Sequence, residues 1–554
     1  MAAIFKRKIV LASAILSGLI AAPAAAQIQT GQLSDASAFD VSLLKDGEPS
    51  LDSALWSDTS ASAATIMIKT ADLKTHGAAQ VLTRAAVLSG GVPPYAANGE
   101  DRNQYVASKM EALLDVAALD SFDKLAFSTS ARKTNPDFSQ MFARRALLGG
   151  ETDEACLQAD TQTPAQRKEP FWAKLRAFCH VIRDEIPAAE LTIDILRRSG
   201  HKDADFFALL GNLTGSAVKL PKLPAENTAL NAAVLRAYMQ AKGVDGGNIN
   251  KLPLVLAAEI AADTAAPDDL RLTALKLAAD IVPDAEFAQI LQNALPVQDG
   301  TAMMAAPDLD ADWTLADWAS AYAALPFAQD STVQAALAAA MLSKAEGTAM
   351  APPVTRLLTP ILRSVPAGAL AAQDPARFAR LAAKQRDLSA LRGLYDALPD
   401  GHGLRARIAL ASDAIGGAFT LADLGTDIET RLAAEGDDKN RAIRDAYIAA
   451  ALGSRLSGGA ADILAEVKVS KGKAAGAGVL LALRSAANRG AKAEAALRAA
   501  KILTAIDPDE MRIDSLAAII FALSDAGMSE QAGLLAAQDF LSGDYDAVAL
   551  SGAP

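Results

Sequence analysis

Two stretches near the C-terminus, VLLALRSAANRGAKAEAALRAAKIL (479–503) and LAAIIFALSDAGMSEQAGLLAAQDFL (516–541), decide the fold of this 554-residue chain. In each stretch an apolar helical pattern runs into a glycine, and these glycines, Gly490 and Gly527, are 37 residues apart. A second apolar pattern follows, with Ala495 or Ala532 five positions after the glycine. A tight helical hairpin requires a glycine that ends one helix and a small residue where the next helix crosses it. The two stretches therefore predict two successive helix–turn–helix units.

Helical segments of this kind recur along the rest of the chain. Hydrophobic residues make up 51% of the sequence but aromatic residues only 5%, because alanine and leucine, both strong helix formers, supply most of the apolar content. Amphipathic segments follow one another, separated by Gly, Pro or Asp. Thr314 and Asp317 form a capping-box pattern, and Pro375 and Pro508 each follow an Asp at a predicted first helical position. We expect an all-α fold.

The hairpin pattern resembles the tetratricopeptide (TPR) repeat, whose period is about 34 residues. Pro508 corresponds to the proline between TPR repeats, whereas the large aromatic residues of that repeat are missing here. The chain as a whole is similar to secreted α-solenoid proteins with degenerate TPR-like repeats. This resemblance implies a right-handed α-solenoid of antiparallel helical hairpins, in two or three segments, and a role as a scaffold or binding platform.

The length and punctuation of the chain predict several parts, since 554 residues exceed the usual size of one compact core. The predicted parts are a signal peptide (1–26), an extended or partly disordered lead-in (27–58), N-terminal helical repeats (59–218), a middle helical segment (226–345) and C-terminal TPR-like repeats (353–545).

The first 26 residues have the pattern of a secretory signal peptide. Lys6, Arg7 and Lys8 precede an apolar run at 9–22, and small residues follow, so we expect cleavage between Ala26 and Gln27. The alanine-rich composition favours a bacterial periplasmic protein, with full secretion as the alternative. No later segment approaches 18 uninterrupted apolar residues, so we expect no stable membrane insertion after cleavage.

The chain is acidic. Its formal net charge is −12, and loss of a signal peptide with three cations and no anion would make it −15. A chain of this charge is repelled by nucleic acid and by anionic lipid headgroups. We therefore expect no nucleic-acid partner.

Cys156 and Cys179 are the two cysteines of the chain. An even count in an oxidising compartment favours a disulfide, and the spacing of 23 does not fit a C-x-x-C redox pair. Cys156 lies on the second helix of one predicted hairpin and Cys179 on the first helix of the next, and such neighbours pack together in a solenoid. Two free buried thiols are the alternative.

Few residues carry recognisable chemistry. The four histidines form no H-E-x-x-H, the chain lacks a G-x-S-x-G elbow and a P-loop, and Trp313 replaces the glycine that an EF-hand needs after Asp308, Asp310 and Asp312. The Glu-Ser pair of lytic transglycosylases is also missing. We predict no catalytic, cofactor or metal site, although a facing pair of carboxylates cannot be picked out among 65 acidic residues.

Two loops share the sequence GTAM and place Met303, Met304 and Met350 in candidate interaction loops, which we expect to be exposed. The alternative is a chance similarity between alanine-rich loops. We expect a non-catalytic periplasmic scaffold or adaptor that binds other cell-envelope proteins. The alternatives are an envelope enzyme or enzyme accessory acting on peptidoglycan, and a structural or stress-related envelope protein.

Overall fold

The computed structural model describes residues 38–45, 48–74, 77–96, 102–129, 136–215, 228–242, 252–295, 308, 310–417, 432, 437–453, 458–467 and 472–542. Within these ranges the regular structure is helical, and the β-type pairings are two isolated bridges, Ser60 with Tyr95 and Lys473 with Met511. This confirms the all-α prediction. The reason is compositional, because alanine and leucine favour helices while strand-forming residues are scarce.

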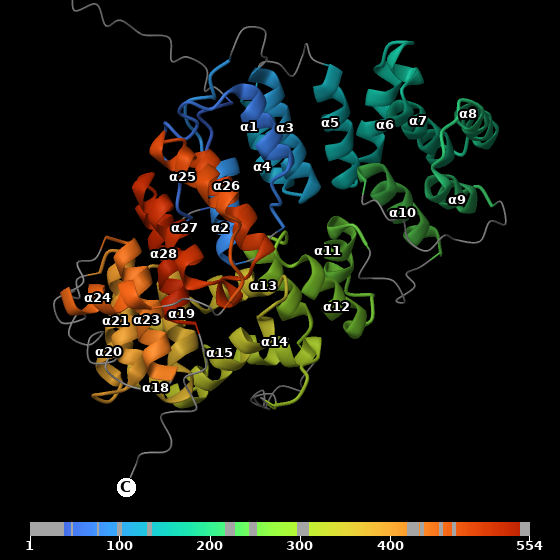
Figure 1. The fold of residues 1–554 in the computed structure, drawn as a ribbon. Helices are drawn as coiled ribbons and strands as arrows, with labels where there is room; N and C mark the ends of the chain where they lie inside the picture. Colours follow the sequence, from blue (N-terminus) through green and yellow to red (C-terminus); the bar gives the residue numbers. More distant parts are fainter. Residues whose placement is uncertain are drawn as a thin grey trace, which may run out of the picture. The chain divides into compact units, whose positions relative to one another are not determined.

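The helices are short and follow one another closely along the chain (Figure 1). The first half contains α1 (Ala61–Lys69), α2 (Gly77–Leu88), α3 (Arg102–Asp115), α4 (Leu119–Phe127), α5 (Pro136–Leu148), α6 (Thr152–Thr161), α7 (Pro170–Ile182), α8 (Ile186–Arg198), α9 (Ala204–Leu213), α10 (Ala229–Lys242), α11 (Leu254–Ala262), α12 (Asp268–Ala278) and α13 (Asp284–Asn293). The second half contains α14 (Leu315–Ala324), α15 (Ser331–Ala345), α16 (Ala351–Leu358), α17 (Ile361–Ser364), α18 (Ala367–Gln373), α19 (Pro375–Lys384), α20 (Leu388–Ala397), α21 (Gly403–Ala414), α23 (Asp437–Ala451), α24 (Gly458–Glu466), α25 (Ala477–Asn488), α26 (Lys492–Ala505), α27 (Ile513–Asp525) and α28 (Ser529–Phe540).

The two C-terminal helix pairs end their first helices in the same way. Gly490 and Gly527 have φ values of 68° and 76°, a left-handed conformation that glycine adopts without steric cost. After each glycine the next N–H donates back to a carbonyl five residues earlier: Ala491 to Ala486 at 3.1 Å and Met528 to Leu523 at 2.9 Å. This is the Schellman arrangement that stops a helix.

The helix starts agree with the sequence in two of the three places singled out. Thr314 and Asp317 form a reciprocal capping box at α14, and Asp374 caps α19 with Pro375 in its first turn. At Pro508 the prediction holds for a single turn, which Asp507 caps and of which Pro508 is the first residue. Pro508–Glu510 form one 3₁₀ turn, and α27 begins only at Ile513, because Met511 and Arg512 are extended.

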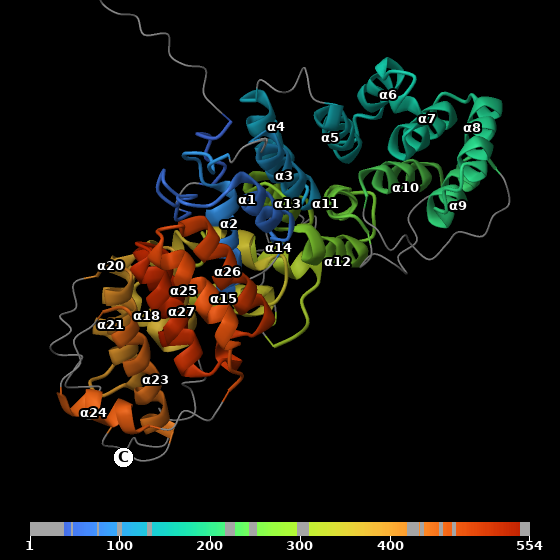
Figure 2. The same ribbon diagram turned by 45° about the horizontal axis from the view of Figure 1, so that its top comes forward.

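Helices joined by short links pack against each other, as in α5–α6, α7–α8, α11–α12, α25–α26 and α27–α28. The most extensive contact between described helices, however, joins α2 to α26, which are about 400 residues apart in the sequence. Figures 1 and 2 both show α2 beside α26. Alanines on both helices, including Ala85, Ala86, Ala495 and Ala499, are fully buried, and such small side chains allow two helices to approach closely.

The residues before α1 lie against the C-terminal helices. In the predicted lead-in (27–58), the described residues form turns and irregular backbone, and Leu55 and Trp56 are 1% and 2% exposed. The N–H of Ala493, in the first turn of α26, donates to the Leu55 carbonyl at 2.8 Å. The Ser50 carbonyl accepts from the Gln531 amide of α28 at 3.3 Å. The segment therefore satisfies a backbone donor that a helix start leaves free.

The described residues from Ala38 onward belong to one compact unit. The boundaries drawn from the sequence at 218–226 and 345–353 stay predictions.

Candidate functional site

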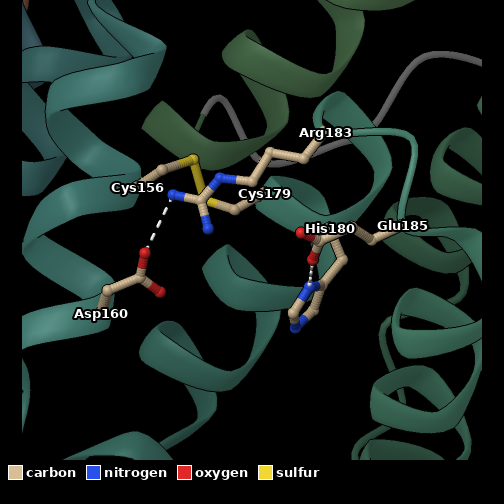
Figure 3. The surroundings of a disulfide bond; sticks show 6 residues. All are labelled: Cys156, Asp160, Cys179, His180, Arg183 and Glu185. Atoms are coloured by element: carbon tan, nitrogen blue, oxygen red, sulfur yellow. Dashed lines mark hydrogen bonds and ion pairs between the residues drawn. A yellow bond between two sulfur atoms is a disulfide. The ribbon is translucent and has the colours of Figure 1, made fainter.

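The two cysteines lie on the consecutive helices α6 and α7 (Figure 3). Cys156 on α6 and Cys179 on α7 are 2% and 1% exposed, with their sulfurs at the disulfide distance of 2.00 Å and their Cα atoms 5.6 Å apart. The paired cysteines and their placement on neighbouring helices confirm the prediction. Arg183 donates to Asp160 at 2.9 Å across the same α6–α7 contact. The pair acts as a structural cross-link, since neither sulfur is free to react.

Of the two predicted interaction loops, the structure describes the one that contains Met350. Met303 and Met304 lie outside the described residues. The prediction that Met350 belongs to an exposed loop is wrong, because its side chain is fully buried. The Ala349 N–H donates to the Lys276 carbonyl at 3.1 Å, which draws this loop onto α12 and places the apolar thioether in the core.

The predicted signal peptide and its cleavage site between Ala26 and Gln27 lie outside the described residues. Among the described helices, none combines the length and the apolar character needed to cross a bilayer. In the described ranges, no three His, Cys, Asp or Glu side chains gather in a way that could hold a metal ion.

A groove runs between α1, α2 and α26, and we call it the α1–α26 groove. It encloses about 1410 Å³ including its open side. Ile66 on α1 is 63% exposed there, an unusual position for a large apolar side chain in a concave surface. The lining residues are Ala63, Ile66, Met67, Thr70, Ala71, Asp72, Thr83, Leu497, Arg498, Ala500, Lys501, Thr504 and Ala505.

A second hollow, the junction pocket, encloses about 980 Å³ including its open mouth. Its walls come from parts of the chain that are far apart in sequence: the segment before α1, α2, the turn after α12, α16, the end of α19, and α28. The lining residues are Leu44, Lys45, Glu48, Pro49, Gln80, Val81, Arg84, Asp280, Pro352, Thr355, Arg356, Lys384, Gln385, Leu534 and Gln538.

Both arginines of the junction pocket are held by carboxylates. Arg84 donates to Glu48 through Nε at 2.9 Å and through Nη2 at 3.1 Å. Arg356 donates through Nε to both oxygens of Asp284, at 2.9 and 2.8 Å. Two-point contacts of this kind fix the guanidinium plane. The arginines therefore form rigid walls, and their charges are already balanced.

The two lysines of the pocket differ from the arginines. In the described part of the chain, neither Lys45 Nζ nor Lys384 Nζ has a carboxylate within ion-pair distance. Burial lowers the pKa of Lys384, and the Arg356 guanidinium lowers it further. Burial also lowers the pKa of Lys45, followed by Arg356 and Arg84. Both side chains keep solvent-exposed surface because the pocket is open, although protein atoms surround them on several sides.

Two acidic groups oppose this positive charge: Asp284, which is already paired with Arg356 and raises the pKa of Lys45, and Asp280. Asp280 raises the pKa of both lysines, so it lies close enough for its charge to reach them. The described contact of its carboxylate is with the Gln80 amide at 3.5 Å, at the limit of a hydrogen bond.

Sequence reasoning did not find either hollow. Helical periodicity marks a lysine on a polar helix face as solvent-exposed, and nothing local shows that several such faces meet. One sequence signal for these hollows was available. Apolar residues lie on several sides of α26, so this helix needs more packing neighbours than the helix next to it in sequence.

Comparison of the chain with protein-family models, with curated proteins and with solved structures found no significant match.

Proposed function

We propose that this protein is a non-catalytic scaffold or adaptor of the bacterial periplasm that binds other cell-envelope proteins. The observation that supports this proposal is the α1–α26 groove, where Ile66 is exposed in an open apolar hollow. Contiguous exposed apolar surface with a polar rim is typical of protein-interaction sites.

The chemistry of the groove suits an apolar segment of a partner. The groove is lined in part by side chains that are small or buried, which leaves room between the helices; these are Ala63, Leu497 and Ala500. Asp72 and Lys501 stand at the polar part of the lining. An amphipathic helix that lays its apolar face into such a groove is a common mode of protein recognition.

We also propose that consecutive helical hairpins stack as right-handed, TPR-like solenoid segments. The α25–α26 and α27–α28 pairs support this, since both turn at a left-handed glycine and both bury the predicted small residue, Ala495 or Ala532. In an open solenoid each repeat contacts its sequence neighbours alone. The contact between α2 and α26 joins helices far apart in the sequence, and an open solenoid has no such contact.

Site-specific photo-cross-linking in living cells tests the binding proposal. A photoreactive amino acid at Ile66 is expected to capture a discrete envelope protein, and I66D is expected to abolish co-purification of that protein. The matched control is the same photoreactive residue at Phe127 on α4, which is 87% exposed and does not line the groove. Equal labelling at both positions, or no capture at Ile66, would contradict the proposal.

Two further measurements separate the rival classes. Export predicts a periplasmic protein whose mature N-terminus is Gln27, which N-terminal sequencing reads directly. A scaffold predicts no peptidoglycan turnover by the purified protein. Turnover that disappears when one carboxylate is replaced by its amide would instead favour an envelope enzyme.

A further inference from the structure

The junction pocket has a positive charge that the protein itself does not balance. Arg84 and Arg356 are each paired with a carboxylate, so their charges cancel within the wall. Lys45 and Lys384 remain without an ion pair in the described residues, with Asp280 as their acidic neighbour. Two ammonium groups against one carboxylate leave an excess of one positive charge, in a chain whose total charge is −12.

Both lysines keep exposed surface at the open pocket, so their charges are accessible to a ligand. An ammonium group that loses part of its hydration and lies near other cations is destabilised. Lysine side chains are long and flexible and normally extend their charge into bulk water. Here Lys384 lies at the end of α19 and Lys45 in the segment before α1, and both line the same hollow. Arg356 lies near enough to both lysines to lower their pKa values, and an anion in this hollow would offset the local excess of positive charge.

The other lining residues of the junction pocket indicate which uncharged groups a bound anion would carry. Leu44, Val81 and Leu534 provide apolar surface, while Thr355, Gln385 and Gln538 provide neutral hydrogen-bonding groups. Polar and charged residues outnumber the apolar residues of the lining, so the pocket suits a ligand that has both a charged group and an apolar part.

We propose that the junction pocket binds a small organic anion that carries an apolar body, with its charged group between Lys45 and Lys384. The ligand class is a free organic acid. The pocket is separate from the α1–α26 groove in its lining residues, so the two sites can be tested independently.

Two fluorescent probes that differ in charge test this assignment. Anilinonaphthalene sulfonate is an anion with an apolar body, and N-phenylnaphthylamine has almost the same body without charge. The full-length mature protein is titrated with each probe. The neutral probe reports binding to any apolar surface, including the α1–α26 groove, so the difference between the two probes isolates the contribution of charge.

K45M and K384M each remove one ammonium and keep most of the apolar stem. Each is expected to weaken binding of the anionic probe about tenfold, which is the effect of losing one charge-assisted contact, and to leave binding of the neutral probe unchanged. D280N removes the opposing carboxylate and is expected to strengthen binding of the anionic probe several-fold. The control is K124M, an exposed lysine of α4 that does not line the pocket.

The lysine and aspartate variants are expected to change binding of the anionic probe in opposite directions and to leave the neutral probe unchanged. A misfolded variant would instead expose apolar surface and change the binding of both probes. Unchanged affinity of the anionic probe in both lysine variants would overturn the proposal. The same holds if K124M weakens binding as much as they do, or if D280N weakens it. Rising salt concentration should also weaken the anionic probe selectively.

Discussion

Replacing Lys109 by methionine is expected to stabilise the protein at neutral pH and to destabilise it at high pH. Lys109 lies on α3 with 2% of its surface exposed. Its ammonium donates to the Ser89 carbonyl at 3.3 Å and lies 5.8 Å from the centre of the Tyr105 ring. In the described residues it has no carboxylate partner, so a charge is buried with little compensation.

The magnitude follows from the pKa. Burial lowers the pKa of Lys109 from 10.5 to about 8. Below pH 8 both the folded and the unfolded chain bind the proton, and the folded state carries the whole cost, about 3 kcal/mol at about 1.4 kcal/mol per pH unit. Between pH 8 and 10.5 the unfolded chain binds more protons, so this contribution to stability rises with pH. Above 10.5 the cost is gone.

Methionine removes the charge but also the hydrogen bond to Ser89, which is worth about 1 kcal/mol. K109M should therefore be more stable than the wild type by about 2 kcal/mol at pH 7. It should be less stable by about 1 kcal/mol above pH 10.5.

Denaturant unfolding of both proteins across pH 7 to 10 measures this difference, with K124M as the exposed control. A difference in unfolding free energy that does not change with pH would refute the reasoning, as would a K109M variant that is less stable at pH 7.

Three further substitutions test the packing by the same unfolding measurements. W56A should cost about 3–5 kcal/mol, since the Trp56 side chain is 2% exposed and its Nε1 donates to Tyr105 Oη at 2.8 Å; a loss below about 1 kcal/mol would contradict the burial. C156S should cost about 3–4 kcal/mol through the lost cross-link, and a reductant should lower the stability of the wild type equally; indifference to reductant argues against the bond. D539N should cost about 3 kcal/mol, because Asp539 is 3% exposed and both of its oxygens lie 3.0 Å from Arg444 Nε; stability within about 0.5 kcal/mol of wild type would show that the amide replaces the carboxylate.

Several helix ends could be read from the sequence because their causes are local. A glycine such as Gly490 ends a helix through hydrogen bonds to residues a few positions away. The capping box of Thr314 and Asp317 spans one turn. The pairing of Cys156 with Cys179 is almost as local, since it needs no more than the packing of α6 on the next α-helix, α7.

Met350 shows where local reasoning fails. A methionine in a loop rich in Gly, Ala and Pro has the composition of an exposed segment, but a hydrogen bond from Ala349 to α12 pulls the loop into the core. The donor and acceptor of that bond are 73 residues apart, so no window of sequence contains both.

By itself, the sequence determined the helical class, the helix stops and the cysteine cross-link, because propensity, turn geometry and hairpin packing act over short distances. The tertiary structure alone decided that α2 lies against α26 and that Lys45 and Lys384 line one pocket. The helix faces made of alanine and leucine are similar along the whole chain. They therefore specify that a helix is buried but not which other helix it packs against. Which helix packs against which is decided when all the helices pack together, and the two candidate sites form where those helices meet.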